Sequence, residues 1–137
     1  MTRHSLNDET HPDGWRVARL GELVKIRGGR SPSQISLASS GEFPYLKVND
    51  LNHCEKYLSS AAQYSNLDSS DLVPKTSIVF AKRGAAIRTN KIRIVMQPCY
   101  IDTNLMALSV DAARADTEYL YYTLLREKLW RIADIST

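Results

Sequence analysis

The chain has 137 residues, 43% of them hydrophobic and 24% charged, which is the composition of one ordinary globular domain. Its net charge is +3, no apolar run approaches the roughly 18 residues of a membrane span, and two cysteines are too few for a disulfide framework. These values exclude a membrane protein, a secreted cysteine-rich scaffold, a collagen-like fibre and a multidomain machine. We expect a cytoplasmic protein in which Cys54 and Cys99 are free thiols.

The positive charge is concentrated in two segments. Residues 72–101 hold six bases and no acid, and residues 14–34 hold five bases against Glu22 alone, whereas the rest of the chain is net acidic. Such asymmetry in a small domain favours a polyanionic partner that meets one face of the protein. The alternative is a surface on which the charges balance in three dimensions.

The first part of the chain is predicted to contain a polar arm and a helix. Residues 1–13 are polar and lack the apolar stretch of a signal peptide, so we expect a mobile arm. Residues 18–26 place Leu20, Leu23 and Val24 on one side of a helix. This spacing predicts a short amphipathic helix.

A loop and a strand are expected next. Residues 27–33 contain two glycines and a proline, which predicts a loop. Residues 43–48, with the sequence FPYLKV, are typical of a short strand, which Asn49 and Asp50 close. Residues 55–72 are polar and favour no particular element.

Three further strands are predicted in the second half. Residues 77–81 form a continuous apolar run that indicates a buried strand, and a basic turn with a glycine follows at 82–86. Residues 91–97 alternate in polarity, which indicates a half-buried strand with a partly basic outer face. Residues 104–110 predict another strand.

The last predicted element is the clearest helix. Asp116 is placed to cap its N-terminus, and Glu118 lies in its first turn. Apolar residues recur after it at helical spacing, namely Tyr121, Leu124, Leu125, Leu129 and Ile132. The order of elements predicts a single α+β domain with a mixed, mostly antiparallel sheet, a short N-terminal helix and a longer C-terminal helix.

No catalytic constellation is found in the sequence. Phosphate-binding loops, nucleophile elbows and glycine-rich cofactor fingerprints are absent, and the cysteines and histidines lack the paired spacing of a zinc site. Glu22 and Lys25 have the residue types of a metal-dependent nuclease but lie on the face of a predicted helix, and no second acid lies close to Asp102. We therefore expect binding rather than catalysis, with no metal and no cofactor.

Six sequence blocks follow one another in an order that a known family shares. They are the Trp and Leu-Gly-Glu opening at 14–23, the glycine-rich loop at 28–33, the strand at 43–51, the block ending in Arg-Gly at 73–84, the strand at 102–108 and the Tyr-Leu-Tyr-Tyr helix at 118–125. Together they resemble a target recognition domain from the specificity subunit of type I restriction-modification enzymes. The resemblance extends from residue 14 to about residue 133.

The family pattern continues where this sequence stops. In the family, a Gly/Gln/Asn-rich segment and a Leu-Pro-Pro-type motif lead into a long spacer helix that docks the modification subunits. The resemblance thus implies that residues 14–137 form one recognition domain that is incomplete at its C-terminal end. A truncated gene product, a relic and a fragment are the three interpretations of this ending.

The resemblance implies sequence-specific binding of duplex DNA, while modification and restriction subunits perform methylation and cleavage. The contacts are expected from loops and strand ends whose side chains neutralise phosphates or read base edges. Arg83 and Arg88 are candidates for guanine, and Gln34 and Asn90 for adenine. The full set of candidates is Arg27, Arg30, Ser31, Gln34, Lys47, Asn49, Lys82, Arg83, Arg88, Asn90, Lys91 and Arg93.

Other functions stay open at this point. An RNA or single-strand binding module would share the charge but needs exposed aromatic residues on a sheet face. A half-subunit or relic could act as an interaction module on modification subunits, or the domain could bind nucleic acid without specificity. A nuclease would cut DNA in the presence of magnesium, and we expect no such activity.

Overall fold

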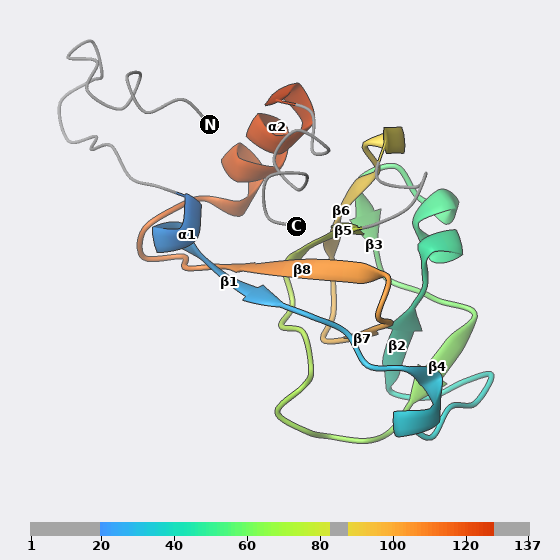
Figure 1. Ribbon diagram of the computed structural model, residues 1–137. Helices are drawn as coiled ribbons and strands as arrows, with labels where there is room; N and C mark the ends of the chain where they lie inside the picture. The colour runs from blue at the N-terminus through green and yellow to red at the C-terminus, as the bar shows by residue number, and fades with distance from the viewer. Residues whose placement is uncertain (1–19, 83–87, 128–137) are drawn as a thin grey trace, which may run out of the picture.

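The computed structural model describes residues 20–82 and 88–127 (Figure 1). Two sheets form its framework. The larger sheet contains, in spatial order, β1 (Val24–Arg27), β8 (Leu105–Val110), β5 (Ile78–Ala81), β6 (Ile92–Val95) and β3 (Tyr57–Leu58). The smaller sheet contains β4 (Gln63–Ser65), β2 (Phe43–Leu46) and β7 (Tyr100–Ile101).

Helical segments accompany the sheets. They are α1 (Leu20–Leu23), the 3-10 turns η2 (Pro32–Gln34) and η3 (Val48–His53), and α2 (Thr117–Glu127). The β3–β6 and β2–β7 pairs are parallel and the other strand pairs are antiparallel. The predicted α+β class, with a mixed and mostly antiparallel sheet and a longer C-terminal helix, is confirmed.

The larger sheet is covered on both faces, which explains its apolar strands. Alternate residues of a strand point to opposite faces. On β5, Ile78 and Phe80 pack with Leu120 and Leu124 of α2, whereas Val79 packs in the cluster on the opposite face. That second cluster includes residues of β2, η3, β7 and β8. The strand prediction for 77–81 is therefore confirmed at Ile78–Ala81.

A strand is present within the predicted segment 91–97, at Ile92–Val95, but the prediction that it is half-buried with a partly basic outer face is wrong. All four residues of β6 are buried, because α2 covers one face and η3 the other. Arg93 is 9% exposed, and its guanidinium donates to the Leu51 carbonyl at 2.9 Å through Nε. It also donates to the Ile92 carbonyl at 3.1 Å. These two bonds give donors of the buried guanidinium partners inside the fold, whereas the alternating pattern predicted that Arg93 faces solvent.

The N-terminal helix is much shorter than the predicted 18–26. Helix α1 ends at Leu23, and the chain continues as β1 from Val24. This strand pairs with β8 in the register Val24↔Val110 to Arg27↔Ala107. Pairing with the β8 edge overrides the helical spacing of a short segment that contains β-branched residues.

The remaining predicted elements agree with the structure within one or two residues. The strand predicted at 43–48 covers Phe43–Leu46, and η3 begins at Val48 in place of the expected turn. The strand predicted at 104–110 covers Leu105–Val110. Helix α2 begins after Asp116, whose Oδ2 accepts the Tyr119 N–H at 3.0 Å, so the predicted cap is confirmed.

Some predictions concern residues outside the described ranges. These are the arm at 1–13, the first two residues of the helix predicted at 18–26, the basic turn at 82–86 after Lys82, which includes Arg83, and the helix residues Leu129 and Ile132. Within the described ranges, no helix is long and apolar enough to cross a membrane.

Candidate nucleic-acid interface

The turn between β7 and β8 joins three segments that the sequence singled out. Arg30 donates its backbone N–H to the Ile101 carbonyl at 2.9 Å, and Asp102 donates its N–H to the Leu46 carbonyl at 3.0 Å. Lys82 donates its N–H to the Asn104 carbonyl at 3.0 Å. Segments that are far apart in sequence thus meet at one turn.

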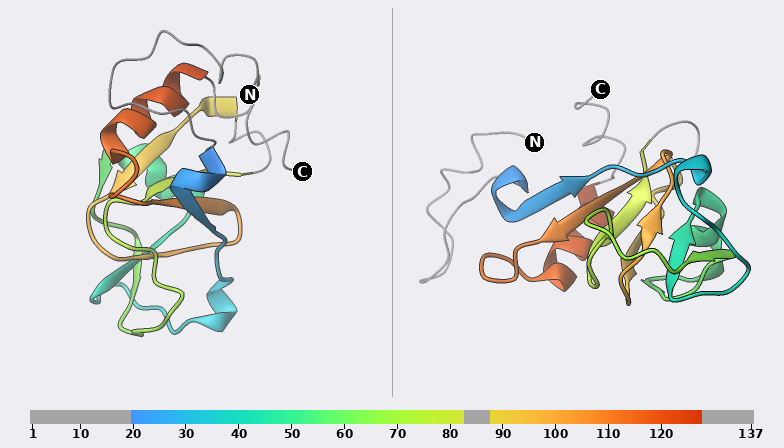
Figure 2. Two further views of the ribbon diagram at one scale, coloured as in Figure 1. Left: turned by 90° about the vertical axis from the view of Figure 1, so that its left-hand side faces the viewer. Right: turned by 90° about the horizontal axis from the view of Figure 1, so that it is seen from below.

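We call this region the basic end. It comprises the loop 28–34, the segment 47–52, Lys82 and the segment 88–91. Figure 2 (right) shows η2 and η3 on the side of the molecule away from α1, whereas Figure 1 shows η2 at the bottom and η3 higher up, near the start of β6. The two basic segments of the sequence are thus connected through the turn at 101–104, and they extend from it toward different ends of this side of the molecule.

Gly29 allows the first segment to approach the turn. A Cβ atom at this position would lie 1.8 Å from the Asp102 carbonyl oxygen and 2.5 Å from that of Ile101. Both are backbone atoms, so they have little freedom to move away. At neighbouring Gly28, a Cβ would have nothing within 4 Å. The close approach thus requires glycine at position 29 alone.

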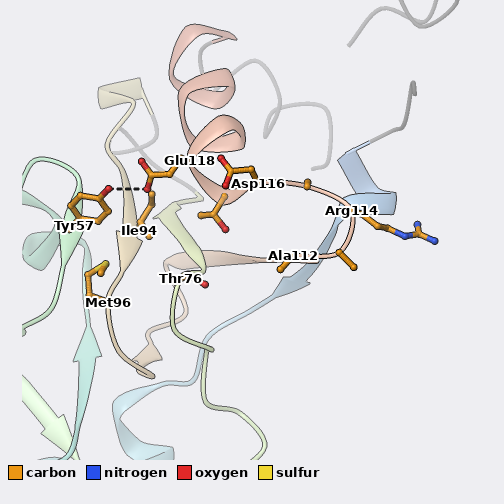
Figure 3. Close-up of a pocket in the computed structure, with 11 residues that line it drawn as sticks. Tyr57, Thr76, Ile94, Met96, Ala112, Arg114, Asp116 and Glu118 are labelled. Carbon is orange, nitrogen blue, oxygen red and sulfur yellow. Dashed lines mark hydrogen bonds between the residues drawn. The ribbon is translucent and has the colours of Figure 1, made fainter. Parts of the chain in front are cut away.

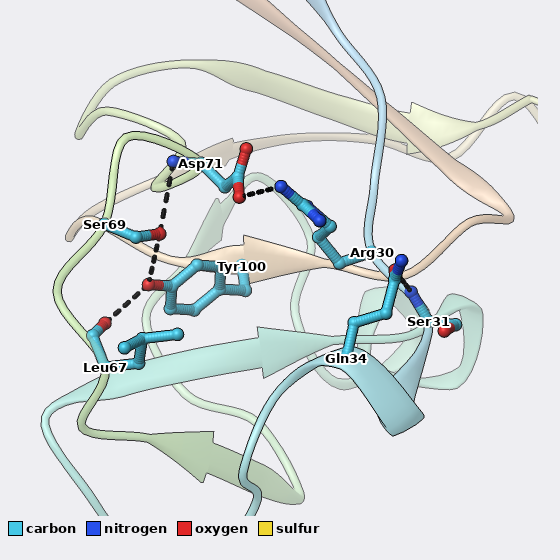
Figure 4. Close-up of polar contacts among 7 residues, drawn as sticks. All are labelled: Arg30, Ser31, Gln34, Leu67, Ser69, Asp71 and Tyr100. Carbon is cyan, nitrogen blue, oxygen red and sulfur yellow. Dashed lines mark hydrogen bonds and ion pairs between the residues drawn. The ribbon is translucent and has the colours of Figure 1, made fainter.

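Polar groups of the first segment bond to other groups of the protein (Figure 4). Arg30 forms an ion pair with Asp71, and Ser31 donates its N–H to Gln34 Oε1 at 2.9 Å. Arg27 is half-buried, and its Nε donates to Ser109 Oγ at 2.8 Å. Arg30, Ser31 and Gln34 thus lie together in the loop and already make bonds within the protein, whereas the Arg27 side chain is bonded to β8.

The Tyr45 hydroxyl also holds the loop 28–34. It donates to the Arg30 carbonyl at 2.6 Å. Burial, followed by the charge of Asp102, raises the pKa of Tyr45 to about 12. The hydroxyl therefore stays protonated and remains a donor over the physiological pH range.

The second segment leaves its lysines available. Within residues 20–82 and 88–127, neither Lys82 nor Lys91 forms an ion pair. Lys91 Nζ donates to Asn52 Oδ1, and Asn52 Nδ2 donates to Asn49 Oδ1 at 3.3 Å. Lys91 and Asn52 also line a small hollow together with Val48, Leu51, Ala81 and Thr89. Arg88 is exposed beside it.

The backbone of Lys47 is held by Asp50. Its N–H donates to Asp50 Oδ2 at 2.8 Å, and Asp50 Oδ1 accepts the Ala62 N–H at 3.1 Å. Asp50 is buried, so this carboxylate holds the start of η3 without facing the surface. The Lys47 side chain is half-exposed.

The side chains of two predicted site residues bond within the fold. Arg93 is buried under η3. Asn90 has φ of 53° and donates through Nδ2 to the Leu125 carbonyl of α2 at 3.2 Å. Asparagine tolerates this left-handed conformation better than most residues, so the side chain joins the start of β6 to α2.

Sequence reasoning missed Asn52 and Asp71. Asn52 could have been found, because Asn49 and Asn52 are three residues apart and a 3-10 turn places such pairs on one face. Asp71 lies in the segment 55–72, for which no element was predicted. Its pairing with Arg30 depends on a contact across 41 positions of the sequence, which no local pattern signals.

A second concave region lies by α2, away from the lysines of the basic end (Figure 3). It is an open trough of about 690 Å³, with Ile94 and Met96 from the β6 side and residues 112–118 on the other side. Lys56 pairs with Glu118, and Tyr57 donates its hydroxyl to Glu118 Oε2 at 2.9 Å. In the described part of the chain, no group of three histidine, cysteine or acidic residues could hold a metal.

The pair beside this trough ties β3 to α2. Hydrogen bonding to Glu118 raises the pKa of Lys56, and the same contact lowers the pKa of Glu118. The Lys56 ammonium also lies 4.5 Å from the ring centre of Tyr122 and 5.3 Å from that of Tyr121. Both sides of the pair are thus committed to the α2 contact.

Known proteins are similar to this chain in sequence and in fold. The type I restriction enzyme MjaIX specificity subunit of Methanocaldococcus jannaschii is 26% identical over 126 residues, which cover 87% of this chain and 28% of that subunit. A solved chain described under complex assembly and conformational transition of the type I R-M system aligns with a TM-score of 0.69 at 19% identity, covering 89% of this chain and 30% of that one.

A second solved structure gives a similar fit. The HsdS subunit from Thermoanaerobacter tengcongensis aligns with a TM-score of 0.66 at 18% identity, covering 89% of this chain and 30% of that subunit. The chain thus spans less than a third of the length of these relatives. The family model of the type I restriction modification DNA specificity domain matches residues 12–134. Because this match includes nearly the whole sequence, the chain belongs to the family of type I restriction modification DNA specificity domains.

Proposed function

We propose that this domain binds duplex DNA through the basic end and recognises a short base sequence there. The observation that supports the proposal is the turn at 101–104, to which Arg30, the end of β2 before η3, and Lys82 are each connected by a backbone hydrogen bond. A polyanionic partner can meet these segments together, although 50 residues separate Lys82 from Pro32 along the chain.

The lysines supply the electrostatic part of binding. Lys82 and Lys91 form no ion pair within the described ranges, so their ammonium groups are available to phosphates. Each neutralised phosphate releases condensed counterions, which makes the affinity fall with salt. Arg88 and Lys47 add charge at the edges of this surface, and Arg83 remains a candidate on the basis of sequence.

The surface favours duplex DNA over single strands. Single-strand binding requires exposed aromatic side chains on which bases stack. The exposed tyrosines of the described ranges are Tyr57, Tyr119 and Tyr122, which lie on β3 and α2. They are thus separated from Lys82 and the 101–104 turn. Base reading in the major groove instead uses amide and guanidinium groups, which the basic end supplies.

We further propose that the domain has no catalytic role. Its partners would be double-stranded DNA and, as the family resemblance implies, the modification and restriction subunits of a type I complex in the cytoplasm. Methyl transfer and cleavage would belong to those subunits. The alternative, an interaction module that binds modification subunits without DNA, predicts co-purification with such a subunit and no salt-dependent DNA affinity.

The test is fluorescence anisotropy of the chain with a randomised duplex pool over a series of salt concentrations. If six phosphates are neutralised, the slope of log affinity against log salt is expected to be roughly −5. Single-stranded competitor of the same length should displace the duplex poorly. Absence of binding at low salt, or equal competition by the single strand, would contradict the proposal.

A further inference from the structure

Three side chains of the basic end form a continuous polar chain. Lys91 donates to Asn52 Oδ1, and Asn52 donates through Nδ2 to Asn49 Oδ1 at 3.3 Å. Both asparagines lie on η3, where their spacing of three residues places them on one face. Lys91 comes from the segment before β6, so the chain links two segments of the proposed DNA surface.

The chemistry of the lysine fixes the donor-to-acceptor direction of these two hydrogen bonds. An ammonium group donates hydrogen bonds and accepts none. The oxygen of the Asn52 amide must therefore face Lys91, and its NH₂ group must face Asn49. The Asn49 oxygen in turn accepts this bond, which turns the Asn49 NH₂ group away from Asn52. Within the described ranges this NH₂ group has no partner, and Asn49 is exposed.

We propose that Asn49 reads an adenine in the major groove and that Asn52 is the positioning residue that fixes the Asn49 amide. The inference rests on the proposed function. An asparagine pairs with adenine by donating to N7 and accepting from the N6 amino group. Asn49 retains both capacities, because its NH₂ group is unpaired and its oxygen has a second lone pair. A preset orientation also reduces the entropy lost on binding.

The two adenine candidates from sequence differ from Asn49 in the bonds that they make. Gln34 uses its oxygen to accept the Ser31 N–H, and Asn90 uses its NH₂ group to hold the Leu125 carbonyl. Asn90 would have to break this bond before it could donate to a base, whereas the Gln34 oxygen keeps a second lone pair and its orientation is fixed by the backbone of its own turn. Asn49 pairs without such a loss, since its bond to Asn52 leaves its NH₂ group and one lone pair of its oxygen unoccupied, and that bond connects it to the second basic segment through Lys91.

The experiment selects bound sequences from a randomised duplex pool with the 137-residue chain and its variants. We expect wild type to enrich a motif with at least one required adenine. Asn49→Ala and Asn52→Ala should both reduce the preference at that same position by roughly tenfold, while the other positions and the salt dependence stay unchanged. Asn66→Ala is the matched control, because this exposed asparagine bonds the Glu42 N–H in a loop of the smaller sheet.

A second variant tests the positioning role of Asn52 by reversing the direction of its hydrogen bond with Asn49. In Asn52→Asp, the carboxylate still accepts from Lys91 but cannot donate to Asn49. The Asn49 amide should then rotate to donate toward residue 52 and present its oxygen to the base. The preference at this position is expected to move from adenine toward cytosine, whose N4 amino group is a donor. A purely structural role of Asn52 would not change the identity of the preferred base.

The outcomes separate the inference from the proposed function. Enrichment of a motif in which Asn49→Ala or Asn52→Ala changes no position, or changes a position that is not adenine, would overturn the inference and leave DNA recognition intact. Failure of wild type to enrich any sequence would overturn both. Thermal melts of each variant establish that the fold is retained, which is expected because both asparagine side chains are exposed.

Discussion

The two basic segments of the chain reach the same turn but use their charges differently. In the segment 27–34, Arg27 bonds Ser109, Arg30 pairs with Asp71, and Gln34 bonds Ser31. Beyond β5, Lys82 and Lys91 have no ion pair within residues 20–82 and 88–127. A count of charges in the sequence therefore overstates the first segment as a binding surface, because its side chains stabilise the fold.

The largest expected effect concerns the structural segment. Gly29→Ala should lower the free energy of unfolding by roughly 3 kcal/mol, because the new Cβ collides with backbone carbonyls that cannot easily move. Urea unfolding followed by circular dichroism measures it. Gly28→Ala is the control and should cost much less, since a Cβ there meets no atom within 4 Å. Equal stability of the two variants would show that the loop does not approach the turn this closely.

The next effect separates the buried basic residue Arg93 from the basic residues on the surface. Arg93→Met should lower the free energy of unfolding by about 2 kcal/mol, because the Leu51 carbonyl loses its charged donor. The slope of DNA affinity against salt should not change, since a buried guanidinium contacts no phosphate. A variant of normal stability with a shallower slope would place Arg93 on the DNA surface, as its sequence position suggested.

The third prediction concerns DNA affinity directly. Lys82→Ala should weaken duplex binding several-fold at low salt and make the slope of log affinity against log salt shallower by about 1. Lys75→Ala is the matched control, because Lys75 lies before β5 and Lys82 follows its other end. Salt-dependent anisotropy measures both. Identical losses in the two variants would indicate unspecific attraction by the whole surface.

A smaller effect is expected from the ion pair of the first segment. Arg30→Ala should change the free energy of unfolding by less than about 1 kcal/mol, as is usual for exposed pairs. It should also change the salt slope less than Lys82→Ala does, because Arg30 is held by Asp71. Asp71→Asn releases the guanidinium and is expected to strengthen duplex binding slightly. If Arg30→Ala reduced the slope as much as Lys82→Ala, the contrast between the two segments would fail.

The smallest effect is a pH dependence at the contact between β3 and α2. Because Lys56 lowers the pKa of Glu118, this pair stabilises the fold above the ordinary pKa of a glutamate, and its contribution is lost as the pH falls through the lowered value. The melting temperature of wild type should exceed that of Glu118→Gln at pH 7, and the difference should shrink in acid. A difference that does not vary with pH would contradict the ion pair.

Strong local patterns allowed part of the fold to be predicted. The run at 77–81 became β5 because both faces of the sheet are covered, and Asp116 caps α2 as its position suggested. The helix predicted at 18–26 was wrong beyond Leu23, because the pairing of β1 with β8 is a long-range contact that helical spacing does not report. The short strands β3, β4 and β7 escaped prediction because two or three residues show no periodicity.

The candidate site depended still more on tertiary contacts. Basic residue types at loops and strand ends were visible in the sequence, and so was their segregation into two segments. The sequence does not show which basic side chains are available to DNA, since the pairing of Arg30 with Asp71 and the burial of Arg93 arise only when the sheets assemble. The role proposed for Asn52 likewise depends on Lys91, which lies 39 positions away in the sequence.

The most direct measurement is amide hydrogen exchange of the chain with and without duplex DNA. We predict slower exchange in peptides that cover 47–53 and 82–91 when duplex is bound, with no change at 112–118 beside the α2 trough. The loop 28–34 should show a smaller change. Protection confined to α2 and the trough, or none at the basic end despite bound DNA, would contradict the account.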